Sequence, residues 1–247
     1  METTKSELIF GLRPLLEAIR AGETIEKIII QKDLNGDLFK ELNQVLKTGD
    51  KIPVQMVPKE ALNRITQENH QGIIAYISPI DFIPIELKVM EMFEAKITPF
   101  VLILDHITDV KNFGAIVRSA EAMGVNLVIT PLKGSAKINS ESIKSSTGAI
   151  FHLPFSRISN LIDAVDLLKA LGLKIVSATE KGQLDVNDAD LSGPIALVMG
   201  SEEKGITKSI LKRSDVQVKI PLLGKTASLN VSVATGIVLY EINRQGR

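Results

Sequence analysis

The segment FVLILDHITDVKNFGAIVRSAEAMGVNLVIT, residues 100–130, decides the fold class. Its first five residues, FVLIL at 100–104, are all apolar and predict a strand buried on both faces. A helix is predicted at 112–124 and a second strand at 126–130. Strand, helix and strand in succession form the unit from which parallel sheets are built, so this part of the chain is predicted to be an α/β domain.

The rest of the C-terminal part continues the alternation of strands and helices. We expect strands at 174–179, 195–200 and 215–220, and helices at 158–172 and about 230–244. Ligands of open parallel sheets bind beyond the carboxyl ends of the strands. This rule selects three loops as candidate site segments, at 105–112, 200–205 and 221–230.

The first 80 residues show a smaller α/β pattern. Helices are predicted at 14–22, at 37–49 and after Pro58, and strands at 27–31, 53–57 and 72–78. Residues 79–99 contain three prolines and one isolated helix, as expected of a connection between domains. The predicted organisation is a domain at 1–80, a linker at 81–98 and a second domain at 99–247.

Composition excludes several classes of protein. The chain has 247 residues, a formal net charge of zero and no cysteine, so disulfides, thiolate metal sites and cysteine nucleophiles are excluded. The three histidines, at 70, 106 and 152, are widely spaced, and we expect no metal site. A neutral chain has no overall attraction to nucleic acid, so an RNA-binding surface would need locally clustered basic residues.

The sequence also lacks the patterns of a membrane-spanning segment and of a secretion signal. No apolar run reaches the length of about 18 residues that spans a bilayer. The first 20 residues lack a basic region followed by an apolar core and a small-residue cleavage site. We therefore expect a cytoplasmic protein with no membrane partner.

The common signatures of α/β enzymes are absent from the sequence. Neither GxGxxG nor GxxxxGK[ST] occurs, which disfavours dinucleotide and nucleoside triphosphate binding, and there is no GxSxG of hydrolases. The candidate loops instead carry Asn, Arg, Glu and Ser side chains. Such groups orient substrates by hydrogen bonds and bind anions.

Each loop also has a plain structural interpretation. Asn112 stands where a helix N-cap belongs, and Arg118 could simply pair with Glu121. The loop at 199–207 could be a surface turn permitted by its glycines. One of Ser228 and Asn230 would suffice to cap the last helix, so the second polar group needs another reason.

Taken together, three segments resemble the motifs of the SpoU (TrmH-like) family of the SPOUT superfamily, RNA ribose 2′-O-methyltransferases. They are LDHITDVKNFGAIVRSAEAMGV at 104–125, LVMGSEEKGI at 197–206 and IPLLGKTASLNVSVATGIVLYE at 220–241. IFGLRPLLEAI at 9–19 and NHQGIIAYISP at 69–79 resemble the small L30e-like domain that precedes the catalytic domain in part of this family. The resemblance is nearest to the RlmB-like branch, which methylates a guanosine of 23S rRNA.

The resemblance implies a fold, a cofactor and an assembly. The fold would be a small L30e-like α/β domain followed by a SPOUT α/β-knot domain, a parallel sheet whose C-terminal segment forms a trefoil knot. The cofactor would be S-adenosyl-L-methionine, held by Thr179, Gly200, Ile220 and Leu229. The partners would be RNA, with ribosomal RNA expected, and a second copy of the chain in a homodimer, without a metal.

The resemblance also implies the catalytic residues Asn112, Arg118, Glu202, Ser228 and Asn230. Because a guanidinium stays protonated in proteins, Arg118 is better suited to clamp a phosphate and stabilise a developing alkoxide than to act as a base. Asn112 would hold Arg118 and Glu202 would orient Arg118 or the ribose. Ser228 and Asn230 would fix the hydroxyl and the third loop.

Three alternatives remain open at this point. The same chemistry could act on transfer RNA. The chain could be a non-catalytic RNA-binding or assembly factor on the same fold, which would bind RNA without transferring a methyl group. An α/β oxidoreductase is the third, and the missing GxGxxG argues against it.

Overall fold

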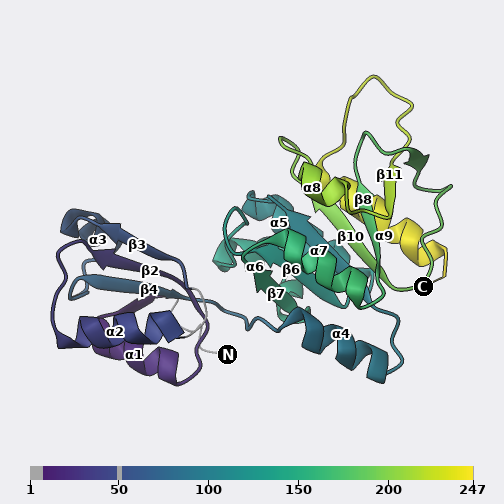
Figure 1. Cartoon of the computed structure of the whole chain (residues 1–247). Helices are drawn as coiled ribbons and strands as arrows, with labels where there is room; N and C mark the ends of the chain where they lie inside the picture. The colour runs from purple at the N-terminus through teal and green to yellow at the C-terminus, as the bar shows by residue number, and fades with distance from the viewer. Residues whose placement is uncertain (1–7, 49–51, 247) are drawn as a thin grey trace. The chain divides into compact units, whose positions relative to one another are not determined.

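The structure is a computed structural model that describes residues 8–48 and 52–246 (Figure 1). The chain divides into two compact units, one ending at Asp81 and the other beginning at Phe82. Each unit has its own sheet and its own core.

The first unit contains a four-stranded mixed sheet of order β1-β4-β2-β3 in its described residues. β4 is antiparallel to β1 and β2, whereas β2 and β3 are parallel. The strands are β1 (Leu8–Phe10), β2 (Ile25–Gln31), β3 (Val54–Val57) and β4 (Ile73–Ile77), and the helices are α1 (Leu12–Arg20), α2 (Asp37–Thr48) and α3 (Lys59–Ile65). Gly49, the predicted end of α2, lies outside the described residues.

The core of the first unit lies on both faces of this sheet. α1 and α2 bury one face, where Leu15, Ile28 and Leu42 are fully covered. α3 covers the other face through Leu62, which packs near Ile74. The unit therefore has a hydrophobic core of its own.

The second unit is built on a sheet of order β7-β6-β5-β10-β8-β11-β9, seven strands within 82–246, and every pairing in it is parallel. This confirms the predicted α/β class. The strands are β5 (Phe100–Asp105), β6 (Leu127–Pro131), β7 (Phe155–Ile158), β8 (Lys174–Ala178), β9 (Leu184–Asp185), β10 (Ile195–Gly200) and β11 (Val216–Lys219). The central strands β5 and β10 are completely buried apart from Gly200, as their apolar sequences predict.

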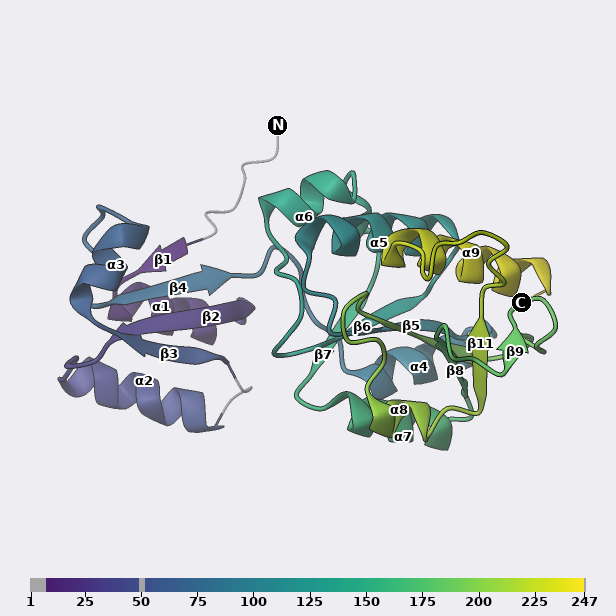
Figure 2. The same cartoon turned by 90° about the horizontal axis from the view of Figure 1, so that it is seen from above.

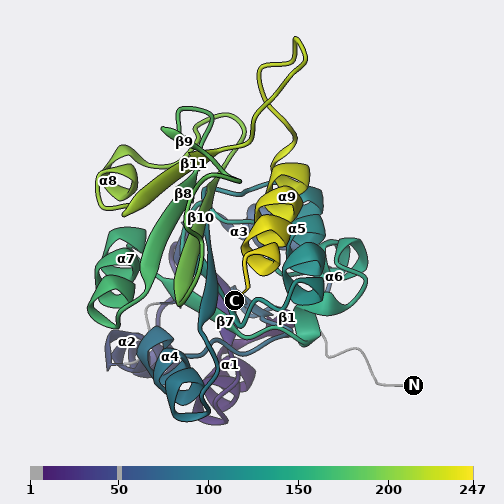
Figure 3. The ribbon, with the colours of Figure 1, turned by 90° about the vertical axis from the view of Figure 1, so that its right-hand side faces the viewer.

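Helices cover both faces of this sheet (Figures 2 and 3). One face carries α4 (Ile85–Glu94), α7 (Leu161–Ala170) and α8 (Lys208–Leu211); the other carries α5 (Val110–Ala122), α6 (Ser140–Ser145) and α9 (Val231–Arg244), with a short 3₁₀ turn at Ala149–Phe151. Among the described residues, no helix has both the length and the apolar character needed to cross a bilayer.

Apart from Asp81, the segment predicted as a linker, 81–98, is part of the second unit. Ile85, Val89 and Met92 of α4 are at most 7% exposed and pack in the core beneath the sheet. Upstream, Ile83 N donates to Phe155 O at 2.7 Å and ties the segment to β7. The prolines that suggested a linker flank a helix whose apolar stripe is buried.

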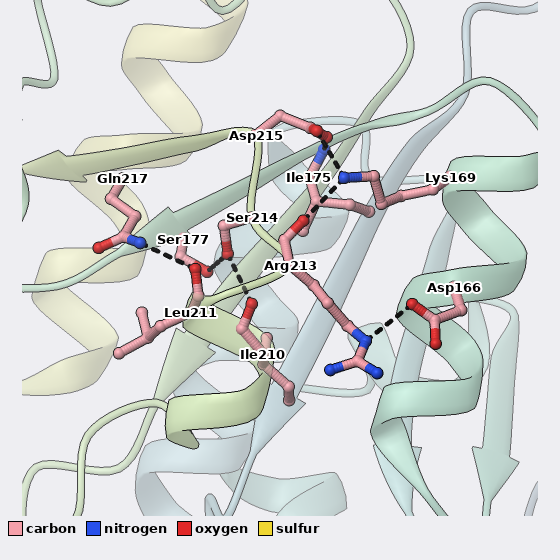
Figure 4. A network of polar contacts seen from close by, with 10 residues as sticks. All are labelled: Asp166, Lys169, Ile175, Ser177, Ile210, Leu211, Arg213, Ser214, Asp215 and Gln217. Atoms are coloured by element: carbon pink, nitrogen blue, oxygen red, sulfur yellow. Dashed lines mark hydrogen bonds and ion pairs between the residues drawn. The ribbon is translucent and has the colours of Figure 1, made fainter.

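A polar network fixes the turn between α8 and β11 (Figure 4). Lys169 Nζ on α7 donates to Arg213 O at 2.9 Å and to Asp215 Oδ1 at 2.6 Å, and Asp215 Oδ2 accepts from Ile175 N at 2.8 Å. Burial raises the pKa of Asp215, but the hydrogen bonds from Lys169 and Ile175 and the charge of Lys169 outweigh it and hold that pKa below its usual value. The network places the start of β11, whose far end leads into the loop before α9.

Candidate functional site

The first turn of α5 leaves the side chain of Asn112 free to reach another loop. The N-cap of α5 is Asp109, whose Oδ1 accepts from Asn112 N at 2.7 Å. The prediction that Asn112 is the cap is therefore wrong, because the helix begins two residues earlier, at Val110. Instead, Asn112 Oδ1 accepts a hydrogen bond from Asn230 at 3.0 Å.

Asn230 uses both ends of its side-chain amide. Its Oδ1 caps α9 by accepting from Ser232 N at 3.0 Å and from Ser232 Oγ at 2.5 Å. Its Nδ2 donates to Asn112 Oδ1 and, at 2.7 Å, to Glu202 Oε1. Glu202 Oε1 also accepts from Val231 N at 2.9 Å. One side chain thus closes a helix end and joins two loops.

The loop after β10 turns back tightly on itself, which places Glu202 in this cluster. Gly205 N donates to Ser201 O at 2.8 Å. A Cβ on Gly200 would lie 2.3 Å from the carbonyl carbon of Gly205, so only glycine fits there. Because Gly200 is in register with Asp105 of β5, the two loops leave neighbouring strands at the same edge of the sheet.

A cleft of about 400 Å³ lies beyond the carboxyl ends of β8, β10 and β11. All four residues predicted to bind a cofactor line it, together with two of the predicted catalytic residues: Thr179, Gly200, Ile220, Leu229, Glu202 and Ser228. Its wall is partly apolar, through Met199, Val218 and Leu222. A cleft of this size, with apolar walls and a few polar groups, suits a small organic ligand.

A second cleft of about 260 Å³ lies on the other side of residues 201–204. It is lined by residues that precede or begin α5, among them His106, Asp109 and Asn112. Residues 201–204 and Val231 line both clefts. Glu202 therefore stands in a wall between two ligand-sized spaces, bonded to Asn230.

Arg118 is not part of this cluster within one chain. It is exposed on α5, six residues after Asn112, which at about 100° per residue places it roughly 240° around the helix. The plain alternative, an ion pair with Glu121, is not found among the described residues. Ser228 is exposed and lines the first cleft but has no bond to Asn230.

Asp105 and His106 lie in the candidate loop at 105–112, although the sequence analysis did not select them as individual site residues. Asp105 ends β5 and is 1% exposed, and its Oδ1 lies 2.5 Å from His106 Nδ1. Asp105 Oδ2 accepts from Thr207 N at 2.6 Å. The sequence pattern that could have indicated these two residues is an acidic residue directly after a buried strand, followed by a histidine.

The chain matches models of two families of RNA-methylating proteins, one in each unit. The model of the SpoU rRNA Methylase family matches residues 99–240. A model described as RNA 2′-O ribose methyltransferase substrate binding matches residues 8–82. The chain belongs to the SpoU family of RNA methyltransferases.

Individual relatives cover almost the whole chain. A protein of Staphylococcus saprophyticus described as a TrmH family tRNA/rRNA methyltransferase is 35% identical over 96% of this chain and 95% of its own length. The crystal structure of the SpoU methyltransferase AviRb from Streptomyces viridochromogenes, in complex with AdoMet, is 26% identical, with a TM-score of 0.60 over 96% of this chain and 89% of that one. The A. aeolicus TrmH/SpoU tRNA modifying enzyme is 30% identical, with a TM-score of 0.54 over 65% of this chain and 83% of its own.

Proposed function

We propose that the chain transfers the methyl group of S-adenosylmethionine to a ribose 2′-hydroxyl of RNA. The observation that carries this proposal is the bonded set of Asn112, Asn230 and Glu202 in the wall between two clefts. The two clefts share residues 201–204 and Val231, so a methyl donor in one and a ribose in the other would lie on either side of this shared lining. Holding the two reactants in line can supply several kcal/mol of the barrier, about 7 kcal/mol or more in the best cases.

The first cleft fits the proposed donor in size and in chemistry. Apolar residues can cover an adenine ring, and Gly200, Ile220 and Leu229 line the same cleft, where their backbones would contact its edge. Three glutamates and two lysines line this cleft, so its carboxylates outnumber its ammonium groups by one: Glu180, Glu202, Glu203, Lys181 and Lys204. The bound AdoMet of AviRb supports the same assignment. The donor supplies a reactive methyl group, and the chain positions the hydroxyl.

The cluster residues have defined parts in this proposal. The side-chain amide of Asn230 is held in place by its hydrogen bonds with Ser232 N and Glu202, so it can help to fix the position of the ribose. Asn112 holds the amide from the other side. Ser228 lines the first cleft, where its hydroxyl can contact the donor or the ribose. A preorganised polar site of this kind favours the transition state over the ground state.

We propose that the active form is a homodimer in which Arg118 serves the site of the partner. α9 exposes Val233, Ile237 and Tyr240 at spacings of four and three residues, which form an apolar stripe on its outer face. An isologous contact through this stripe would bury it. Arg118 faces solvent on the neighbouring helix α5, so it is free to reach across. Sedimentation velocity should show a dimer; a stable and active monomer would contradict the proposal.

The proposed target is a guanosine of 23S rRNA, selected by an RNA substrate-binding domain at 1–80 and methylated by the domain at 99–247. The match to the substrate-binding family model supports this division of labour. A tRNA target is the alternative, because relatives are described as tRNA/rRNA methyltransferases. Both would act in the cytoplasm, and the implied trefoil knot stays a prediction.

The target is tested by mapping ribose methylation in total RNA from cells with and without this protein. We expect one 2′-O-methylguanosine in large-subunit RNA to disappear without the protein and to return with the wild-type gene. Restoration should fail with Asn230→Ala. Loss of a tRNA methylation instead would select the alternative target, and an unchanged map would contradict the proposal.

A further inference from the structure

His106 is held in an unusual position at the second cleft. Its backbone φ is +59°, in the left-handed region that few side chains adopt. The side chain lines the second cleft, as do Asn112 and Glu202. The side chain is 44% exposed, although its neighbour Asp105 is almost completely buried.

The hydrogen bond to Asp105 determines which ring nitrogen faces the cleft. Nδ1 lies 2.5 Å from Asp105 Oδ1, and the carboxylate is fixed by Thr207 N on its other oxygen. In the neutral imidazole only one nitrogen carries a proton, and a carboxylate accepts that proton's hydrogen bond. Nδ1 is therefore the donor, and Nε2 carries a lone pair.

Nε2 is open to a ligand. Among the described residues no hydrogen bond to Nε2 is present. The ring packs beside Gly134, where an added Cβ would lie 3.4 Å from Cδ2 and 3.9 Å from Nε2. A buried carboxylate behind an imidazole that faces a ligand stabilises the imidazolium formed when Nε2 takes up a proton. The geometry is that of a proton acceptor.

We propose that His106 Nε2 accepts the proton that the target ribose 2′-hydroxyl loses during methyl transfer. The proposal rests on the proposed function. The O–H bond breaks, and its electron pair forms the new bond to the methyl carbon. The sulfur keeps the electron pair of the bond to the methyl group that breaks, and the proton moves to Nε2 and then to water. With His106 as the base, Arg118 can remain protonated, as a guanidinium does in proteins, and act only as a positive charge.

Other charged groups face the same cleft and must be distinguished from His106. They come from the N-cap of α5 and the loop after β10: Asp109, Glu202, Glu203 and Lys204, with the buried Asp105 behind the imidazole. Asp105, Asp109 and Glu202 already accept hydrogen bonds from the protein. Glu203 is the competing acceptor whose carboxylate has no hydrogen bond at either oxygen among the described residues.

The test compares His106→Asn with Glu203→Gln. Asparagine tolerates the left-handed backbone but cannot act as a base at neutral pH. Single-turnover methylation, at saturating RNA and donor, is followed from about pH 5 to about pH 9, across the titration range of histidine. Dissociation constants for RNA and for S-adenosylmethionine are measured in parallel. ¹⁵N NMR of the free protein reports the tautomer of His106.

We expect His106→Asn to lower the rate at neutral pH about 100-fold or more, the contribution usual for a positioned base, and to remove the rise of rate with pH. Donor affinity should stay within about twofold, and Glu203→Gln should keep the pH profile. NMR should show the proton on Nδ1. An unchanged rate and profile for His106→Asn, or loss of the profile in Glu203→Gln, would overturn the proposal. If the wild-type protein methylates no ribose, the proposed function is wrong. The NMR measurement of the His106 tautomer then still tests the predicted hydrogen bond between His106 and Asp105.

Discussion

Asn230 and Asn112 lie 118 positions apart in the sequence, yet Nδ2 of Asn230 donates to Oδ1 of Asn112 at 3.0 Å. The bond joins the N-terminus of α9 to the first turn of α5, two helices that lie side by side on the same face of the sheet (Figure 3). Glu202 accepts from the same nitrogen and adds the loop after β10. Three loops are thereby held together by one amide.

This relationship predicts that capping and bridging by Asn230 can be separated. Asn230→Ser keeps an N-cap oxygen but is too short to reach Asn112 and Glu202. We expect its free energy of unfolding to change by only a few tenths of a kcal/mol, whereas Asn230→Ala should cost about 1 kcal/mol. Both variants should lose most methyl transfer, measured as incorporation of label into RNA.

Asn160 provides the matched control, because its Oδ1 caps α7 by accepting from Ile162 N at 3.1 Å, away from both clefts. Asn160→Ala should cost a similar amount of stability and leave the turnover unchanged. Equal losses of activity in the Asn160 and Asn230 variants would mean that activity follows stability alone.

Gly200→Ala should distort the wall of the first cleft. The added Cβ would meet the backbone of Gly205 and Ile206 at 2.3–2.4 Å, so the loop must move. Overpacking of this kind costs about 1–3 kcal/mol, and we expect weaker binding of S-adenosylmethionine by calorimetry. Gly224→Ala is the control, since nothing lies within 4 Å of its added Cβ. Unchanged donor affinity in Gly200→Ala would argue against this cleft as the donor site.

Arg118→Ala should abolish methyl transfer without weakening donor binding, because Arg118 lies outside the first cleft. If Arg118 acts in the partner's site, mixing Arg118→Ala with Asn230→Ala subunits should restore activity. Random exchange of subunits makes half of the dimers mixed, each with one intact site, so about a quarter of wild-type activity is expected. A mixture that stays inactive after exchange would place Arg118 in the site of its own chain or outside catalysis.

The network around Asp215 predicts a pH dependence of stability. Its pKa is lowered in the folded protein, so its contribution is complete above the unfolded pKa and is lost as the pH falls through the folded value. Asp215→Asn should lower the melting temperature at pH 7. As the pH falls toward about 4 or below, the melting temperature of this variant should decrease less than that of the wild type. Asp166→Asn, which removes an exposed pair with Arg213, should change little. An identical pH dependence in Asp215→Asn and wild type would rule out this contribution.

The sequence predicts the sheet well where the strands are buried on both faces. The apolar runs at β5, β10 and β8 leave little ambiguity, and all three form as predicted. Short elements were missed: β1 has three residues, and β7, at Phe155–Ile158, runs directly into a predicted helix. Periodicity needs a longer window than such strands provide.

The site was predictable in its residues but not in its bonds. Composition of the loops and the family resemblance select Asn112, Glu202 and Asn230, whereas the contacts among them depend on the register of β5 beside β10 and on α5 beside α9. Local pattern also misplaced the cap of α5, because both Asp109 and Asn112 are good capping residues. The role of His106 depends on a positive φ that no pattern indicates.

The central claim is tested most directly by identifying the methylated atom. Purified protein is incubated with S-adenosylmethionine carrying an isotopically labelled methyl group and with large-subunit ribosomal RNA, and the RNA is digested to nucleosides for mass spectrometry. The account predicts label in a 2′-O-methylated nucleoside, with the methyl group on the ribose fragment and its amount strongly reduced for Asn230→Ser. Label on a base, or none in any RNA offered, would contradict it.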